Sequence, residues 1–134
     1  MREILFRGKR KKDGKWIYGY LVKHDEFVIV DKSLGSIGCG AQVIPETIGE
    51  FTGLVDKDGT KIFEDDIVRT IYGRLCVVHW CSFPSYVGWD LTPVPTKNNL
   101  EKKPPRLADL MKARHLRVVG NVADNPELFK EETK

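Results

Sequence analysis

Hydrophobic and polar side chains alternate along much of the chain with a period of two, which is the pattern of β-strands. Residues 3–9 and 15–23 are the first two such stretches, and the Asp13-Gly14 pair between them favours a tight turn. We therefore predict an N-terminal β-hairpin. Apolar residues lie on both faces of its second strand, so both faces are expected to be partly covered. Those on one face are Trp16, Tyr18, Tyr20 and Val22, and those on the other are Ile17 and Leu21.

Further strands are predicted in the middle of the chain. A short β-branched run covers residues 27–30, and the glycine-rich residues 34–40 after it are typical of a mobile loop. Strands are expected on both sides of the Asp58-Gly59 turn. Residues 67–71 and 75–80 pair naturally across a tight turn that contains Gly73, and we expect this to be the strongest strand pair.

The last third of the chain is predicted to be less regular. After Ser82 the chain is expected to become irregular, and prolines 93, 95, 104 and 105 favour a loop over residues 91–103. Pro105 suits the first turn of a short helix that ends near His115. Residues 116–122 return to strand, and residues 125–129 predict a final helical turn.

These elements predict a mainly β fold of the β-rich α+β type. Several short strands with one or two short helices favour a small, partly open β-barrel or twisted sheet, because closure removes exposed strand edges. The length of 134 residues fits a single domain, 1–134, with a hairpin and loop region over 1–45 and a barrel region over 46–134.

Composition places the chain among ordinary globular proteins, with 41% hydrophobic and 31% charged residues. No apolar run approaches the roughly 18 residues of a membrane span, and the first residues lack the apolar core, about 7–15 residues long, of a signal peptide. The three cysteines form an odd set without the spacing of a disulfide framework. We therefore expect a cytoplasmic protein with reduced thiols.

Positive charge is concentrated at the start of the chain, although the net charge is only +3. Cations contact phosphates and aromatic rings stack on bases, so basic and aromatic residues together favour binding of single-stranded or flexible nucleic acid. The lysines of a hairpin tip also serve solubility, and aromatic residues at this spacing also pack sheet cores. The candidate binding residues are Arg7, Lys9, Arg10, Lys11, Lys12, Lys15, Trp16 and Tyr18, with Arg106, Lys112, Arg114 and Arg117 as a possible second strip.

Long and unusual motifs give the chain a resemblance to a known family. They include Arg2-Glu3-Ile4 with Phe6-Arg7-Gly8, the block Pro45-Glu46-Thr47-Ile48-Gly49 with Phe51-Thr52-Gly53-Leu54, and the closing Asn125-Pro126-Glu127-Leu128. Over nearly its whole length the chain resembles the YopX family of phage and prophage proteins. The resemblance implies a β-rich fold with an SH3-like barrel element, an intracellular location and a phage or prophage origin, and it supplies no catalytic residue.

The sequence departs from that family at one turn. Where the family usually has Glu-Gly-Asp-Ile-Val, this chain has Asp65 in place of the glycine. Any backbone conformation that requires glycine at this position is therefore in question.

Two clusters resemble metal sites, but their spacing argues against both. Cys76, His79 and Cys81 are possible zinc ligands, with Cys39 or His115 as a fourth, yet strand alternation turns Cys76 away from the other two. We expect buried thiols and a partly exposed histidine instead. The acidic residues 56–66 lack the glycine and glutamate positions of a calcium loop, so we interpret them as a solvated turn and a charged strand edge. No metal and no cofactor is predicted.

Catalytic motifs are not recognisable: the serines have no nucleophile motif around them, and residues 34–40 lack the lysine and hydroxyl of a phosphate loop. We therefore expect a non-catalytic binding or regulatory module, with nucleic acid as the first candidate partner. The alternative is an interaction module or self-assembling scaffold that contacts a host or phage protein. It is suggested by aromatic side chains that a small core can leave exposed: Trp16, Phe83, Tyr86, Trp80 and Trp89.

Overall fold

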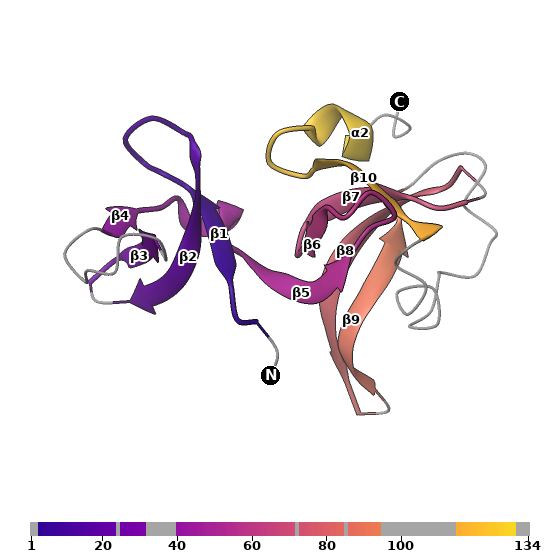
Figure 1. Cartoon of the computed structure of the whole chain (residues 1–134), viewed down its shortest axis with the longest axis horizontal. Helices are drawn as coiled ribbons and strands as arrows, with labels where there is room; N and C mark the ends of the chain where they lie inside the picture. The colour runs from indigo at the N-terminus through magenta and orange to yellow at the C-terminus, as the bar shows by residue number, and fades with distance from the viewer. Residues whose placement is uncertain are drawn as a thin grey trace. The chain divides into compact units, whose positions relative to one another are not determined.

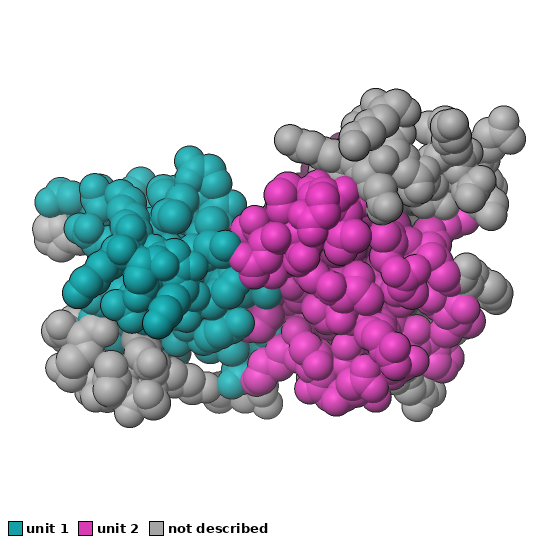
Figure 2. Space-filling model, turned by 90° about the horizontal axis from the view of Figure 1, so that it is seen from above, with its two compact units in different colours: residues 1–53 teal, residues 54–134 magenta. Residues whose placement is uncertain are grey.

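The computed structural model of the whole chain (Figure 1) describes residues 3–23, 25–31, 40–71, 73–84, 86–94 and 115–130. The chain divides into two compact units, residues 1–53 and residues 54–134, which are coloured separately in Figure 2. The division falls inside a strand, β5, which covers Gly49–Val55. Each unit is described below by itself.

The first unit is built from antiparallel strands and one short 3-10 helix. The strand order runs β4-β3-β2-β1-β5, and β5 continues into the second unit, where its neighbour is β6. The elements of the first unit are β1 (Phe6–Lys9), β2 (Trp16–Lys23), β3 (Phe27–Asp31), β4 (Gly40–Gln42), η2 (Pro45–Thr47) and β5.

This sheet curls until the chain after β4 contacts the end of β1. The N–H of Lys11 donates to the carbonyl of Gln42 at 3.0 Å, and the N–H of Ile44 donates to the carbonyl of Lys9 at 2.8 Å. Val43 packs inside the curl at 1% exposure, with Ile29 at 0%. A Cβ on Gly8 would lie 3.1 Å from side-chain atoms of both residues, so a glycine there lets β1 approach the core closely.

The second unit contains a four-stranded antiparallel sheet with the order β10-β7-β8-β9. Its longest pairing joins β8 and β9, which match residue for residue from Cys76 opposite Pro93 to Phe83 opposite Tyr86. The elements of this unit are β6 (Lys61–Phe63), β7 (Asp66–Arg69), β8 (Leu75–Phe83), β9 (Tyr86–Pro93), β10 (Arg117–Asn121) and the helix α2 (Pro126–Lys130).

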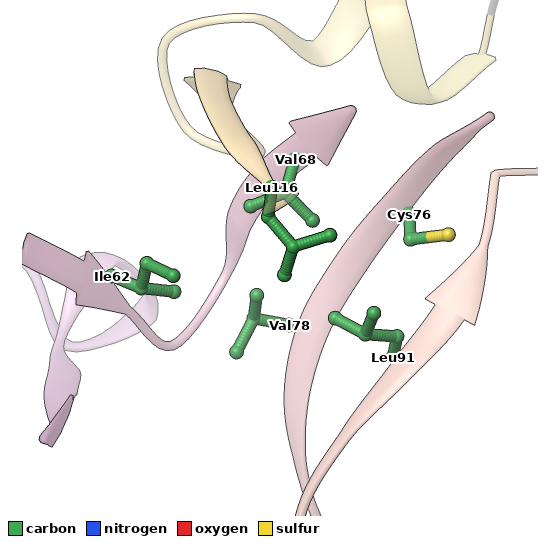
Figure 3. Close-up of a cluster of buried hydrophobic side chains, with 6 residues drawn as sticks. All are labelled: Ile62, Val68, Cys76, Val78, Leu91 and Leu116. Carbon is green, nitrogen blue, oxygen red and sulfur yellow. The ribbon is translucent and has the colours of Figure 1, made fainter. Parts of the chain in front are cut away.

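Each of the two faces of this sheet covers its own cluster of buried apolar side chains. Figure 3 shows the larger one, in which side chains from β6 to β9 converge with the residue before β10: Ile62, Val68, Cys76, Val78, Leu91 and Leu116. The smaller cluster contains Ile67, Val77 and Val94. Leu128 of α2 packs against the smaller cluster, so the C-terminal helix covers it.

The predicted fold class is confirmed, since the chain is mainly β with antiparallel sheets. The described strands form no closed barrel. The N-terminal hairpin, the turn at Asp58-Gly59, the pairing of β7 with β8, the strand β10 and the final helical turn are all present where they were predicted. The glycine-rich residues 34–39 and the helix predicted to begin at Pro105 lie outside the described residues, apart from the end of that helix at His115.

The prediction that the chain becomes irregular after Ser82 is wrong for the residues up to Pro93. Residues 86–93 form β9, and its pairing with β8 is longer than that of β7 with β8, which was expected to be the strongest. The prediction failed because a proline such as Pro93 is normally excluded from the interior of a sheet. Pro93 is the last residue of β9, and β9 is at the edge of the four-stranded sheet, where a missing N–H costs little.

Candidate nucleic-acid interface

One face of the sheet in the first unit presents large apolar side chains to solvent. Tyr18, Tyr20 and Val22 alternate along β2 and are 45%, 49% and 46% exposed. Trp16, two residues before Tyr18, shares this face and is half-buried. The register of β1 and β2 places Lys9 opposite Trp16. We refer to these five residues, Lys9, Trp16, Tyr18, Tyr20 and Val22, as the aromatic face.

Two cations hold the ring of Trp16 in place. The guanidinium carbon of Arg7 lies 4.7 Å from the ring centroid, and the Nζ atom of Lys9 lies 5.5 Å from it. Both distances are typical of cation–π contacts, in which the charge is attracted to the face of the ring. Arg7 lies opposite Tyr18 and therefore projects from the same face of the sheet, but it is only 6% exposed, so its contact with Trp16 is desolvated.

The turn that joins β1 to β2 is ordered by its own backbone. The N–H of Arg10 donates to the carbonyl of Lys15 at 2.9 Å, and the N–H of Gly14 donates to the carbonyl of Arg10 at 2.8 Å. Gly14 has a φ of 70°, which a glycine adopts at little cost. The Asp13 carboxylate accepts the N–H of Lys15 at 3.0 Å. The tip of the hairpin is thus a fixed platform for the lysines that it carries.

Carboxylates of the same unit compensate part of the positive charge. The Nε atom of Arg10 lies 3.4 Å from the Asp13 carboxylate, and Lys11 donates to Glu26 at 3.1 Å. The Lys11–Glu26 pair is exposed, and exposed ion pairs contribute about 0–1 kcal/mol because water screens them, whereas the Nε atom of Arg10 is buried. Lys12 and Lys15 are exposed, and their side chains have no ion pair or hydrogen bond within the described ranges.

The structure therefore separates the predicted binding residues into four sets. Lys9, Trp16 and Tyr18 share one face. Lys12 and Lys15 lie at the hairpin tip, and their ammonium groups form no ion pair with the described residues. Arg10 and Lys11 are paired with carboxylates. Arg7 is buried against Trp16. Sequence reasoning left Tyr20 and Val22 out of the binding set, although the period-two pattern had placed both on the same face.

The second basic strip falls mostly outside the described residues. Arg106, Lys112 and Arg114 lie there, and only Arg117 is described. The Nε atom of Arg117 lies 3.2 Å from the carboxylate of Asp58.

The acidic residues 56–66 include two that are buried, which corrects the prediction of a solvated turn and charged edge. Asp56 is 3% exposed and accepts the N–H groups of Asp58, Thr60 and Val118 at 2.8–2.9 Å. Asp66 is 1% exposed and accepts the N–H of Phe63 at 2.7 Å. Burial raises the pKa of Asp56, but the three N–H donors and the charge of Arg117 outweigh it and leave this pKa below its ordinary value. Both carboxylates thus stabilise turns of the fold.

Strand alternation distributes the cysteines and the histidine of β8 as the sequence predicts. Cys76 packs in the larger core cluster, and Cys81 is buried on the opposite side of the strand together with the half-buried His79. Neither Cys76 nor Cys81 forms a disulfide in the described part of the chain. The zinc set of Cys76, His79 and Cys81 therefore does not form.

Comparison with known proteins supports one assignment. The mainly β architecture defines a small two-sheet antiparallel protein, and the family model described as YopX protein matches residues 5–130. The chain belongs to the YopX family. No curated protein matches it. Within the described ranges, no helix combines the length and the apolar composition needed to cross a membrane.

Proposed function

We propose that this protein is a phage- or prophage-encoded binding module that acts in the cytoplasm of the bacterial host and contacts single-stranded nucleic acid through its aromatic face. Bases stack on the exposed rings of Tyr18 and Tyr20, and phosphates contact Lys9, Lys12 and Lys15. The module works without catalysis, and its effect comes from covering or positioning the bound strand.

The observation that carries the proposal is the exposure of Tyr18 and Tyr20 beside a fixed Trp16. Sheets normally bury aromatic side chains, because removing a large ring from water is energetically favourable. Two adjacent tyrosines that remain about half exposed on a strand form a platform for planar ligands. Stacking of one base on an aromatic side chain contributes about 1–3 kcal/mol and tolerates any base.

Single-stranded ligands fit this face better than duplexes. In a duplex the faces of the bases are already stacked on one another and only their edges are accessible in the grooves. A sheet face with exposed rings offers stacking surfaces, which only unpaired bases can use. The cations beside the rings then follow the flexible backbone.

The ion pairs of the hairpin tip are compatible with this function. Because the Lys11–Glu26 pair is exposed, a phosphate can displace Glu26 at a cost of about 0–1 kcal/mol, whereas the Nε atom of Arg10 beside Asp13 is buried. Arg7 has a different task in the proposal. It is buried, so it positions Trp16 and does not reach a phosphate.

Fluorescence anisotropy with labelled single-stranded and double-stranded oligonucleotides tests the proposal. Titrations at several salt concentrations should give tighter binding of the single strand. The logarithm of the binding constant should fall linearly with the logarithm of the salt concentration, with a slope of about −0.7 for each phosphate contacted. Absence of binding at low salt would overturn the proposal, and so would a preference for the duplex.

A second candidate function rests on the hairpin of β8 and β9. Trp80 is 47% exposed and Val87 is 61% exposed, and Trp80 contacts Trp89 edge to face with ring centroids 5.1 Å apart. Exposed apolar residues of this size favour contact with a host or phage protein, or with a second copy of the chain. Light scattering tests the self-assembly form: a mass that rises with concentration supports it, and a monodisperse monomer contradicts it.

A further inference from the structure

We propose that His79, Cys81 and Asp90 form a three-residue site for Zn²⁺ on the β8–β9 hairpin. One potential ligand atom from each residue lies within 4.8 Å of the other two. The site is in the second unit and does not depend on the proposed nucleic-acid function.

The register of the hairpin assembles the three groups. His79 lies directly opposite Asp90, and Cys81 lies opposite Gly88, which has no side chain to fill the space beside the thiol. His79 and Cys81 are two residues apart on β8 and therefore project from the same face. The third ligand comes from the partner strand, so no spacing within one strand reveals it.

Neighbouring groups already orient two of the ligands. The hydroxyl of Thr92 lies 2.9 Å from Nδ1 of His79 and 3.4 Å from its Nε2, so the closer bond occupies Nδ1 and leaves Nε2 for a metal. The N–H of Leu91 donates to Oδ1 of Asp90 at 2.8 Å, which leaves Oδ2 for the same ion. Such outer partners fix the orientation of ligating side chains in metalloproteins, and their loss typically costs about 10–100-fold in affinity.

The donor set selects zinc among common divalent ions. A thiolate, an imidazole and a carboxylate together suit a borderline-soft cation, whereas Mg²⁺ and Ca²⁺ prefer oxygen donors alone. Neighbouring ligand atoms in a tetrahedral zinc site are about 3.3–3.6 Å apart, as follows from bond lengths of about 2.0–2.3 Å. Small side-chain rotations supply this contraction, because His79 and Asp90 are only half-buried. The fourth position stays open for water or an anion.

Titration of the reduced, full-length protein with Co²⁺, a spectroscopic substitute for zinc, tests the site. We expect one equivalent to produce a thiolate-to-cobalt charge-transfer band and the intense visible bands of tetrahedral cobalt, and added Zn²⁺ to abolish both. The Cys81→Ser variant should lose the charge-transfer band. The matched variant Cys76→Ser, which changes a buried thiol on the other face of the same strand, should keep it.

The variants Asp90→Asn and His79→Gln change half-buried positions and keep the test decisive even if Cys81→Ser fails to fold. Each should weaken Co²⁺ binding by about tenfold or more, since removal of a ligand exceeds the effect of losing its outer partner. Absence of the charge-transfer band in the wild-type protein would overturn the inference. So would a band that persists in folded Cys81→Ser, a band that disappears in folded Cys76→Ser, or unchanged affinity in both ligand variants.

Discussion

The backbone N–H of Val118 donates a hydrogen bond to Oδ2 of Asp56 at 2.9 Å, although 62 residues separate the two positions. The other carboxylate oxygen, Oδ1, accepts the N–H groups of Asp58 and Thr60. One buried carboxylate therefore orders the turn between β5 and β6 and attaches that turn to β10. This contact joins the middle of the chain to its C-terminal part.

Substitution of Asp56 by asparagine should destabilise the protein. The amide keeps one acceptor oxygen but places an NH₂ group where a backbone N–H now donates. Hydrogen bonds to a charged group contribute about 1.5–3 kcal/mol, and a buried unsatisfied donor costs a comparable amount. We expect Asp56→Asn to lower the free energy of unfolding by about 2 kcal/mol or more, measured by urea denaturation.

The exposed neighbour Asp58 provides the control. Asp58→Asn removes a surface ion pair with Arg117, whose effect should stay within about 0–1 kcal/mol. Equal destabilisation by the two variants would contradict the role assigned to Asp56.

The lowered pKa of Asp56 predicts acid sensitivity. In the unfolded chain this carboxyl has its ordinary pKa near 3.8, and in the folded protein its pKa is lower. Because the folded state favours the ionised form, this stabilisation is fully present above pH 3.8 and is lost as the pH falls through the folded pKa.

Urea denaturation of the wild type and of Asp56→Asn between pH 7 and pH 2 measures this effect. The difference in unfolding free energy between the two proteins should be constant near neutral pH and should shrink below about pH 4. A difference that does not depend on pH would show that the ionised form of Asp56 has no special part in stability.

The turn between β6 and β7 contains the position where the chain departs from its family. Asp65 has a φ of 70°, in the left-handed region where an L side chain costs about 1–2 kcal/mol and glycine costs little. The backbone thus adopts the conformation that suits glycine, in spite of the substitution. We expect Asp65→Gly to raise the free energy of unfolding by up to about 1 kcal/mol.

Gly59 provides the opposite test. Its φ is 84°, and a Cβ built on it has no neighbour within 4 Å, so Gly59→Ala changes backbone strain without a clash. The free energy of unfolding of this variant should be about 1 kcal/mol lower than that of the wild type. If Asp65→Gly destabilised the protein as much as Gly59→Ala does, contacts of the Asp65 side chain would outweigh the strain.

The lysines of the hairpin tip should determine part of the salt dependence of nucleic-acid binding. Each phosphate contact to a single strand contributes about 0.7 to the slope of log binding constant against log salt concentration. The double variant Lys12→Gln, Lys15→Gln should therefore reduce the magnitude of this slope by about 1.4 in anisotropy titrations. Lys57→Gln with Lys61→Gln, which removes the same charge from the second unit, should leave the slope unchanged. Equal slopes in the two double variants would exclude contacts at the tip.

The local fold was predictable because short strands and tight turns leave local signals. The alternation over residues 15–23 and the pairs Asp13-Gly14 and Asp58-Gly59 located two hairpins correctly. Strand β9 was missed because Pro93 is normally incompatible with a sheet interior, and a sequence does not state that a strand is at an edge.

The candidate site was predictable only in part, for a similar reason. Alternation placed Trp16, Tyr18 and Tyr20 on one face, but their exposure depends on what the rest of the chain covers. The burial of Arg7 and the pairing of Lys11 with Glu26 also arise from contacts between strands. The approach of Asp90 to His79 depends on the β8–β9 register, which the residues of β8 alone do not specify.

In the proposed function the exposed rings of β2 stack on unpaired bases, and this stacking is measured by the affinity of the double variant Tyr18→Ala, Tyr20→Ala for labelled oligothymidylate. Loss of two stacking contacts of at least about 1 kcal/mol each predicts binding weakened by about thirtyfold or more. The control is Ile71→Ala with Val87→Ala, which removes two apolar side chains of the second unit that are more exposed than the tyrosines and should bind like the wild type. Indistinguishable affinities of the two folded double variants would show that the rings of Tyr18 and Tyr20 do not stack on the bases.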